Sequence, residues 1–484
     1  MCNAPAFAKI HYWFRRISYK PNENILHMRK KTIRRILWVL VIGIIAVATV
    51  FIWPRLPIIT AFAAKGMCSS VFLAEKDPAA VEAEDLSFFP INLAKSEIDV
   101  EAKTVTSTVF GLAKRKAVYR EGLGAVLVLD TPEEVLKAQS FKIPDPGYDQ
   151  DTIPWPLGDV VDETQVDGLD YAVLQAIIDT SFDRAGEEPG KKTLGLAVVY
   201  DGKLVAEQYL GDYDRYTKFH GWSMTKSITG ALAGVLVDQG RLVLKAPTGI
   251  PEWEHDERNE ITTEDVIRMS TGLDWFENYF TISDATVMLM QSADMLDYIT
   301  TCELAHEPGT VWNYSSGDAN LLSGIIRREI NNDEKYHAFA YEALFHRIGM
   351  LNTTVETDAS GLFVASSYSY GTVRDWARFG LLFLNDGVFA GDTVLSSEWV
   401  DFMKTEAPAS DGAYAGTFWL MEPNPLYALT DVPEDVFFAD GFLGQRVYMI
   451  PSKELVVVRM GYGLSGFSMN DFLREVIEAL PVEN

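Results

Sequence analysis

Ser223 and Lys226 have the types and the spacing of a nucleophile and its base. Ser223-Met224-Thr225-Lys226 is the only place among the 484 residues where a lysine stands three positions after a serine. Apolar residues recur at helical spacing over residues 227–240, which predicts a helix that begins close to Ser223. One helical turn brings both side chains to the same face, near the partly positive helix N-terminus. A serine and a lysine arranged in this way can carry out acyl transfer.

The pair needs further groups, because chance produces roughly one such spacing in a chain of this length. A helix-capping serine followed by a solvated lysine is the alternative interpretation. Lysine can act as the base of a serine only when burial or a nearby cation lowers its pKa. A second proton carrier must also serve the leaving group. Tyr314 is the candidate, in a turn-rich segment before a predicted helix at residues 320–331, with packing beside Trp312 as the alternative.

An acyl-transfer site also needs two backbone N–H groups that bind the oxyanion, and one of them often comes from the nucleophile. Ala439-Asp440-Gly441-Phe442-Leu443-Gly444 leads into a predicted C-terminal strand. Its glycines permit a close approach of the backbone to a ligand, with a plain β-turn as the alternative. No G-x-S-x-G motif surrounds Ser223, which disfavours an α/β-hydrolase.

The elements expected to position these residues are early strands, a long helical region and late strands. Residues 194–210 predict a hairpin with its turn at Asp201-Gly202, and the proline-rich residues 131–170 an extended covering segment. Further strands are expected at residues 98–111, 116–130, 414–421, 445–451 and 455–461, and further helices at residues 171–184, 263–270, 288–300 and 470–480. This order predicts an α+β fold, an antiparallel sheet flanked by helices with a helical subdomain.

Composition excludes several classes of function. The net charge is −26, although nine of the 42 basic residues and one of the 68 acidic residues lie in residues 1–54. A body this acidic repels nucleic acid, so no nucleic-acid partner is expected. Three cysteines far apart in the sequence cannot build a disulfide framework, and seven histidines have no metal-ligand spacing. We therefore expect neither a metal nor a cofactor, and the sequence does not indicate an oligomeric state.

The N-terminal region predicts a membrane anchor. Residues 36–53 hold 18 residues without a charge, and the basic residues 29–35 precede them. The positive-inside rule then places the N-terminus in the cytoplasm and the body outside it. We therefore expect a single-pass protein of the cell inner membrane whose catalytic domain is periplasmic or extracytoplasmic. A signal peptide cleaved after Ala61-Phe62-Ala63 is the alternative, and Met28 is an alternative start. The predicted divisions are a cytoplasmic N-terminus (residues 1–35), the transmembrane anchor (36–53), a linker (54–95), a strand extension (96–150) and the hydrolase domain (151–484).

Taken in chain order, these motifs resemble the serine β-lactamase/penicillin-binding-protein superfamily. The resemblance is greatest to the class C-like branch that holds 6-aminohexanoate-dimer hydrolases and family VIII esterases. It covers about residues 150–475 and implies a β-lactamase/transpeptidase-like fold. The matching segments are Thr152 to Asp159, Gly221 to Ser227, Ile261 to Leu273, Pro308 to Ser316 and Gly441 to Pro451.

The resemblance implies a role for each candidate residue. Lys226 would activate Ser223, and Tyr314 would relay the proton to the leaving group. The N–H of Ser223 would bind the oxyanion with an N–H near Gly441 or Phe442. Tyr279 would line the substrate pocket, with packing as the alternative.

Two departures from the superfamily pattern bear on the substrate. Ser316 stands where β-lactamases carry asparagine, and Asp440-Gly441-Phe442 replaces a triplet that begins with a cation. An acidic Asp440 is expected to repel the carboxylate of a β-lactam. The sequence therefore predicts a serine hydrolase of small amides or esters that resembles 6-aminohexanoate-dimer hydrolase. A carboxylesterase, a D-alanyl-D-alanine carboxypeptidase or β-lactamase, and an idle protein that binds cell-wall peptides are the alternatives.

Overall fold

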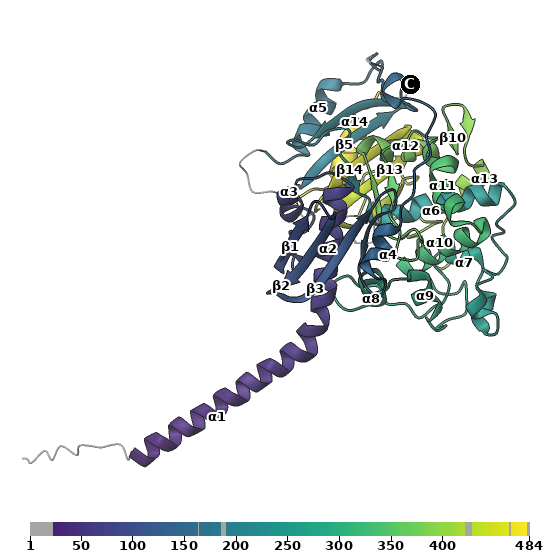
Figure 1. Cartoon of the computed structure of the whole chain (residues 1–484). Coiled ribbons are helices and arrows are strands. Elements are labelled where there is room, and N and C mark those ends of the chain that lie inside the picture. Colours follow the sequence, from purple (N-terminus) through teal and green to yellow (C-terminus); the bar gives the residue numbers. More distant parts are fainter. Residues whose placement is uncertain (1–22, 163, 185–189, 422–427, 464–465, 482–484) are drawn as a thin grey trace, which may run out of the picture. The chain divides into compact units, whose positions relative to one another are not determined.

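A five-stranded antiparallel sheet lies at the centre of residues 55–484 in the computed structural model (Figure 1). The strand order is β12-β13-β14-β5-β6, so β5 and β14, the first and last strands of this sheet in chain order, pair with each other. The five strands are β5 (Thr193–Tyr200), β6 (Lys203–Tyr209), β12 (Phe437–Gly441), β13 (Gln445–Ile450) and β14 (Leu455–Gly461). The predicted hairpin is confirmed, with Asp201 and Gly202 at φ of 47° and 72° in its turn. The structure describes residues 23–162, 164–184, 190–421, 428–463 and 466–481.

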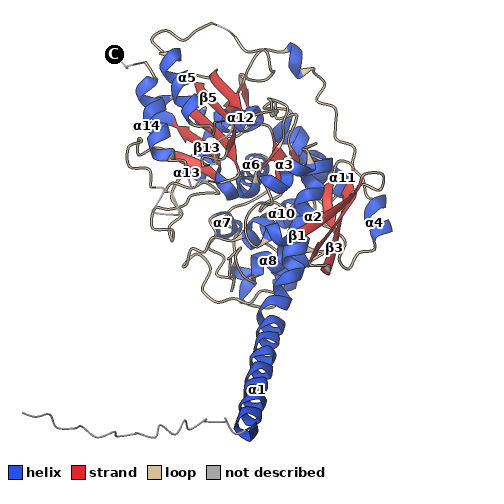
Figure 2. Ribbon diagram, turned by 90° about the vertical axis from the view of Figure 1, so that its left-hand side faces the viewer, coloured by secondary structure: helices blue, strands red, loops and turns tan. Residues whose placement is uncertain are grey.

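Helices cover both faces of this sheet. Helices α5 (Tyr171–Thr180) and α14 (Met469–Ala479) pack on one face, and α12 (Val373–Leu384) packs on the other (Figures 1 and 2). In α14 the buried residues recur at helical spacing, so one stripe of the helix faces the sheet. The predicted antiparallel sheet with flanking helices is confirmed.

The helical region between β6 and β12 holds the candidate nucleophile. Besides α12, its helices are α6 (Thr225–Asp238), α7 (Thr263–Ile267), α8 (Asp284–Gln291), α9 (Met295–Thr300), α10 (Ser316–Ile330), α11 (Asp333–Ala340) and α13 (Ser397–Lys404). Its short strands are β7 (Phe219–His220), β8 (Thr354–Val355), β9 (Ser369–Gly371), β10 (Val388–Phe389) and β11 (Asp392–Thr393). The helix expected at residues 288–300 is divided, because Asp294 caps the start of α9. The strand expected at residues 414–421 forms only isolated bridges, since the chain turns at Thr417, whose φ is 78°.

Residues 54–95 are not the linker that their small and polar side chains predict. They form α2 (Leu56–Phe72) and α3 (Pro78–Ala83), and α2 packs against the sheet β1-β2-β3-β4 and against α8 (Figure 2). That sheet comprises β1 (Ala94–Asp99), β2 (Thr104–Val109), β3 (Leu112–Arg120) and β4 (Gly124–Leu127), where two strands were expected, and α4 (Glu133–Ala138) follows. Ala61 and Ala63, the alternative cleavage site, are buried inside α2.

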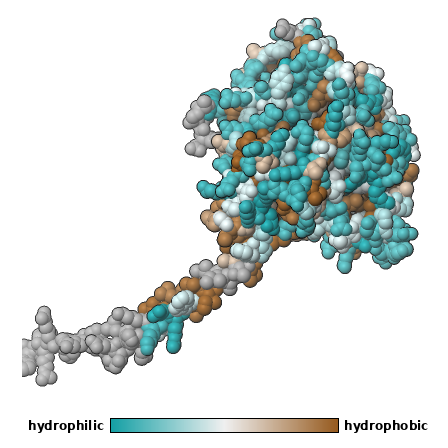
Figure 3. Space-filling view, in the orientation of Figure 1, coloured by the Kyte–Doolittle hydropathy of each residue, from teal (hydrophilic) through white to brown (hydrophobic). Residues whose placement is uncertain are grey.

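The first compact unit is residues 1–54. It contains α1 (Glu23–Val47), followed by a π-helical turn at Ala48–Ile52. Among the described residues, no helix combines the length and the apolar character needed to cross a bilayer, so the transmembrane helix predicted at residues 36–53 is not supported. The uncharged run is shared between α1 and the turn, and in Figure 3 a short hydrophilic patch on α1 is followed by apolar side chains. Residues 1–22 of the predicted N-terminus lie outside the described residues.

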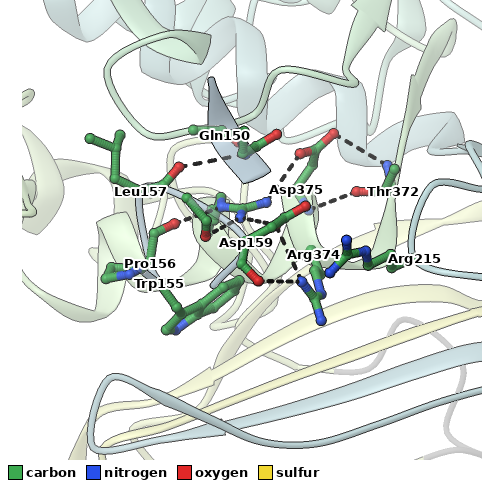
Figure 4. A network of polar contacts seen from close by, with 12 residues as sticks. Gln150, Trp155, Pro156, Leu157, Asp159, Arg215, Thr372, Arg374 and Asp375 are labelled. Carbon is green, nitrogen blue, oxygen red and sulfur yellow. Dashed lines mark hydrogen bonds and ion pairs between the residues drawn. The ribbon is translucent and has the colours of Figure 1, made fainter. Parts of the chain in front are cut away.

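A network of buried charges fixes the segment 150–159 onto α12 (Figure 4). The Asp159 carboxylate pairs with Arg378 at 2.5 Å and with Arg374 at 3.4 Å. Arg378 also donates hydrogen bonds to the carbonyls of Pro156 and Gly158. The sequence stretch from Thr152 to Asp159 therefore clamps the domain rather than entering the site.

A second buried ion pair fixes α2 to the rest of the domain. Glu356, which follows β8, is fully buried and pairs with Lys65 of α2. The same carboxylate accepts hydrogen bonds from Ser69 at 2.9 Å and from the N–H of Ala125 in β4 at 2.6 Å. Burial lowers the pKa of Lys65, and the Glu356 carboxylate acts in the opposite direction. One carboxylate thus joins α2, β4 and the helical region.

Removal of this carboxylate should destabilise the whole domain. We expect Glu356→Gln to lower the free energy of unfolding by about 3–5 kcal/mol, because a buried Lys65 ammonium would lose its partner. Glu133→Gln is the control, since Glu133 pairs with Lys116 of β3 in a partly exposed ion pair. Its removal should lower the free energy of unfolding by at most about 1 kcal/mol. Urea denaturation measures both, and equal losses would contradict the anchoring role.

Candidate active site

Ser223 lies in a short 3-10 turn, Trp222–Met224, that leads into α6. Trp222 has a φ of 49°, which is unusual for a bulky residue. The turn is held to β9, since the Gly221 N–H donates to the Ser369 carbonyl at 2.7 Å and the Thr225 hydroxyl contacts the Ser369 hydroxyl at the same distance. Only glycine fits at position 221, because a Cβ there would come within 2.5 Å of Ser369 and Trp376. Tertiary contacts thus fix the direction of the Ser223 side chain.

Lys226 lies one turn further along α6 and is 1% exposed. Its Nζ donates to Ser223 Oγ at 3.1 Å, to Ser316 Oγ at 3.3 Å and to the Ser366 carbonyl at 2.9 Å. Burial lowers the pKa of Lys226 to about 8, against the opposing effect of the Glu277 carboxylate. A substantial fraction of the lysine is therefore neutral in mildly alkaline water and able to accept a proton.

Tyr314 approaches Ser223 from the segment before α10. Its side chain shares a hydrogen bond with that of Ser223, and Lys226 Nζ lies 4.7 Å from the centroid of its ring. The ring packs against Tyr414 and Trp419, with centroid distances of 5.9 and 5.1 Å. Burial first, and then the nearby Tyr414 and Glu277, raise the pKa of Tyr314 well above its ordinary value. The phenol therefore stays protonated and can supply a proton.

Glu277 is a member of the site that the sequence reading missed. Its carboxylate accepts hydrogen bonds from the Trp275 indole at 2.8 Å, from the Ser316 N–H at 2.6 Å, from the Ser316 hydroxyl at 2.8 Å and from the Tyr279 hydroxyl at 2.9 Å. The sequence feature that could have indicated it is an acidic residue among aromatic residues, shortly after the matching segment that ends at Leu273. Four donors hold a negative charge within reach of Lys226.

Ser316 and Tyr279 connect this carboxylate to the lysine. The Ser316 hydroxyl contacts Lys226 Nζ, the Glu277 carboxylate and, at 2.9 Å, the Tyr279 hydroxyl. Tyr279 is 40% exposed as a whole residue, although its hydroxyl contacts Glu277 and Ser316 inside the site. Burial, followed by the Glu277 charge, raises its pKa well above the ordinary value. Both residues that the sequence reading proposed thus lie in the site.

Gly441 and Phe442, at the end of β12, lie beside the turn that carries Ser223. A Cβ at Gly441 would come within 2.4 Å of the Gly221 carbonyl, so only glycine allows this approach. The Phe442 ring packs edge-on against Trp222, with a centroid distance of 5.4 Å. The end of β12 therefore lies against the turn that carries Ser223, so the backbone N–H groups of Ser223 and of Gly441 or Phe442 are the candidates for an oxyanion site.

Asp440 differs from its expected role. It lies opposite Arg446 in the β12–β13 register, and the two side chains form an ion pair. The neighbouring cation compensates the charge that was expected to repel a substrate carboxylate. Repulsion by Asp440 is therefore a weaker argument against β-lactams than the sequence suggests.

The described residues contain no group of three or more histidine, cysteine, aspartate or glutamate side chains arranged to hold a metal ion. Lys226 and Tyr314 contact the Ser223 hydroxyl, and Ser316 links Lys226 to the Glu277 carboxylate. Such a set can move protons between a hydroxyl nucleophile and a leaving group.

Comparison with known proteins agrees with this geometry. The family model described as Beta-lactamase matches residues 178–472. The 6-aminohexanoate-dimer hydrolase of Paenarthrobacter ureafaciens is 23% identical over 290 residues, which cover 54% of this chain and 71% of that protein. A family VIII carboxylesterase structure superposes with a TM-score of 0.51 at 16% identity, over 64% of this chain and 96% of that one. The structure of EstCE1, a hydrolase with promiscuous acyltransferase activity, gives 0.52 at 14% identity, over 64% and 98%. The two structures share the fold, and the extent of the family match establishes that this chain belongs to the β-lactamase family.

Proposed function

We propose that the protein is a serine hydrolase that cleaves small amides or esters through an acyl-enzyme on Ser223. The contact that carries the proposal is the 3.1 Å distance between Lys226 Nζ and Ser223 Oγ, in a place where burial lowers the pKa of the lysine to about 8. The family match and the similarity to 6-aminohexanoate-dimer hydrolase support the same class of reaction.

The reaction follows from these groups. Neutral Lys226 takes the proton of the Ser223 hydroxyl while Oγ attacks the substrate carbonyl, and two backbone N–H groups bind the oxyanion. Tyr314 gives its proton to the departing amine or alcohol and regains one from the Lys226 ammonium. Water then attacks the acyl-enzyme and gives up a proton through the same pair, and Ser223 regains its hydrogen as the acid leaves.

Ser223→Ala tests the nucleophile. The variant should lose covalent labelling by a fluorophosphonate, and hydrolysis of p-nitrophenyl acetate should fall by about a thousandfold or more. Ser227→Ala is the matched control, because Ser227 is buried in the same helix but donates its hydroxyl to the Thr417 carbonyl, so labelling should persist. A wild-type protein that neither labels nor hydrolyses esters, short amides or β-lactams would instead be an idle binding protein.

Tyr314→Phe separates proton relay from nucleophilic attack. An amine must be protonated as it leaves, whereas p-nitrophenolate leaves unprotonated. We therefore expect kcat/KM to fall about 10²–10⁴-fold for an anilide and far less for the matching p-nitrophenyl ester. Parallel kinetics with both substrates measure the ratio, and equal losses would argue against a leaving-group role.

The pH profile tests Lys226 and Glu277 together. Because the lysine must be neutral, kcat/KM should rise with pH through about 8 and level off above it. Glu277 favours the ammonium form, so Glu277→Gln should lower the pKa of Lys226 and move this rise to lower pH. A rise that stays at the same pH in the variant would contradict the electrostatic role, even where the rate falls.

A further inference from the structure

A cavity of about 90 Å³ opens beside Ser223, and part of its wall comes from outside the β-lactamase match. Helix α2 contributes Ile58, Ile59 and Phe62, and the segment after α3 contributes Phe88. Trp222 and Phe442 line it from the catalytic side. Residues more than 100 positions before the nucleophile thus help to enclose it.

Four aromatic rings in mutual contact join α2 and the segment after α3 to the turn that carries Ser223. Phe62 stacks on Trp222 with centroids 5.5 Å apart, and meets Phe88 edge-on at 5.6 Å. Phe442 lies 5.4 Å from both Phe88 and Trp222. Trp222 and Phe442 directly flank the nucleophile and the candidate oxyanion strand. Helix α2 and the segment after α3 therefore pack against the residues beside Ser223.

The position of the cavity indicates which half of a substrate it receives. Its lining includes Ser223 but neither Lys226 nor Tyr314, the groups that would serve the leaving group. A substrate whose leaving group points to Tyr314 has its acyl chain on the other side of the carbonyl carbon. Because the cavity borders Ser223 and is not lined by Tyr314, it is the space open to that acyl chain.

The charge of the lining indicates what kind of chain fits. Arg55 is the one charged residue among the described residues that line the cavity, and its guanidinium donates to Thr281 at 3.2 Å. Aromatic and aliphatic side chains dominate the rest of the wall. An ammonium at the end of an acyl chain would lose water there without gaining an anionic partner.

We propose that this cavity binds a neutral, apolar acyl chain and that α2 is a wall that determines specificity. The inference rests on the proposed hydrolase function and adds its substrate class: esters or amides of unsubstituted alkanoic acids rather than of ω-amino acids. Each methylene that enters an apolar wall leaves water, which favours the reaction of the longer chain until the cavity is full.

The test compares p-nitrophenyl acetate, butyrate, hexanoate and 6-aminohexanoate, because all four share one leaving group. For the wild type, kcat/KM should rise about fourfold per methylene from acetate until the cavity is full. The 6-aminohexanoyl ester should react at least about tenfold more slowly than the hexanoyl ester. A flat profile, or an aminohexanoyl ester that equals the hexanoyl ester, would overturn the proposal.

Two variants change the wall in opposite directions. Ile58→Phe should fill the cavity and shift the preference to acetate, whereas Phe62→Leu should open it and shift the preference to longer chains. Val71→Phe is the matched control, since Val71 is half-buried on the same helix but does not line the cavity. Thermal unfolding verifies that each variant is folded, and wall variants that keep the wild-type preference would overturn the role of α2.

Different results would refute the acyl-chain pocket and the hydrolase function. Hydrolysis of acetate together with fluorophosphonate labelling, but with no dependence on chain length, refutes the acyl-chain pocket and leaves the hydrolase intact. No hydrolysis of any ester and no labelling refutes the hydrolase itself.

Discussion

A lysine withdrawn from water is the constraint around which this site is built. Burial makes Lys226 a usable base, and the same burial penalises its ammonium form, which the reaction must also produce. The structure meets both demands with short neutral partners, Ser223, Ser316 and the Ser366 carbonyl, and with the Glu277 charge behind Ser316. Helix α6 is buried along most of its length, so the lysine has little freedom to leave these partners.

The local parts of this arrangement were predictable from the sequence. One helical turn suffices to pair Ser223 with Lys226, and the β5–β6 hairpin follows from its Asp-Gly turn. Glu277 was not predictable in the same way, because its partners Ser316 and Trp275 become neighbours of its carboxylate only in the folded chain. The linker predicted at residues 54–95 was wrong for a related reason. The polar residues Lys65 and Ser69 are buried in α2 because Glu356, nearly 300 residues later in the sequence, binds both of them.

The direction of the nucleophile has a cost in backbone conformation. Trp222 holds a positive φ between a glycine that tolerates no side chain and the serine that follows. Its ring is packed by His220 on one side and by Phe62 and Phe442 elsewhere, with the His220 centroid only 3.8 Å away. Packing contacts of this kind can compensate for an unfavourable backbone angle, and here part of that packing is supplied by α2.

The participation of α2 in the cavity wall has an evolutionary consequence. Residues 178–472 match the family, while Ile58, Ile59 and Phe62 precede that region and line the cavity beside Ser223. Changes at Ile58 and Ile59 during evolution can therefore alter the wall beside Ser223 without replacing any residue of the β-lactamase match.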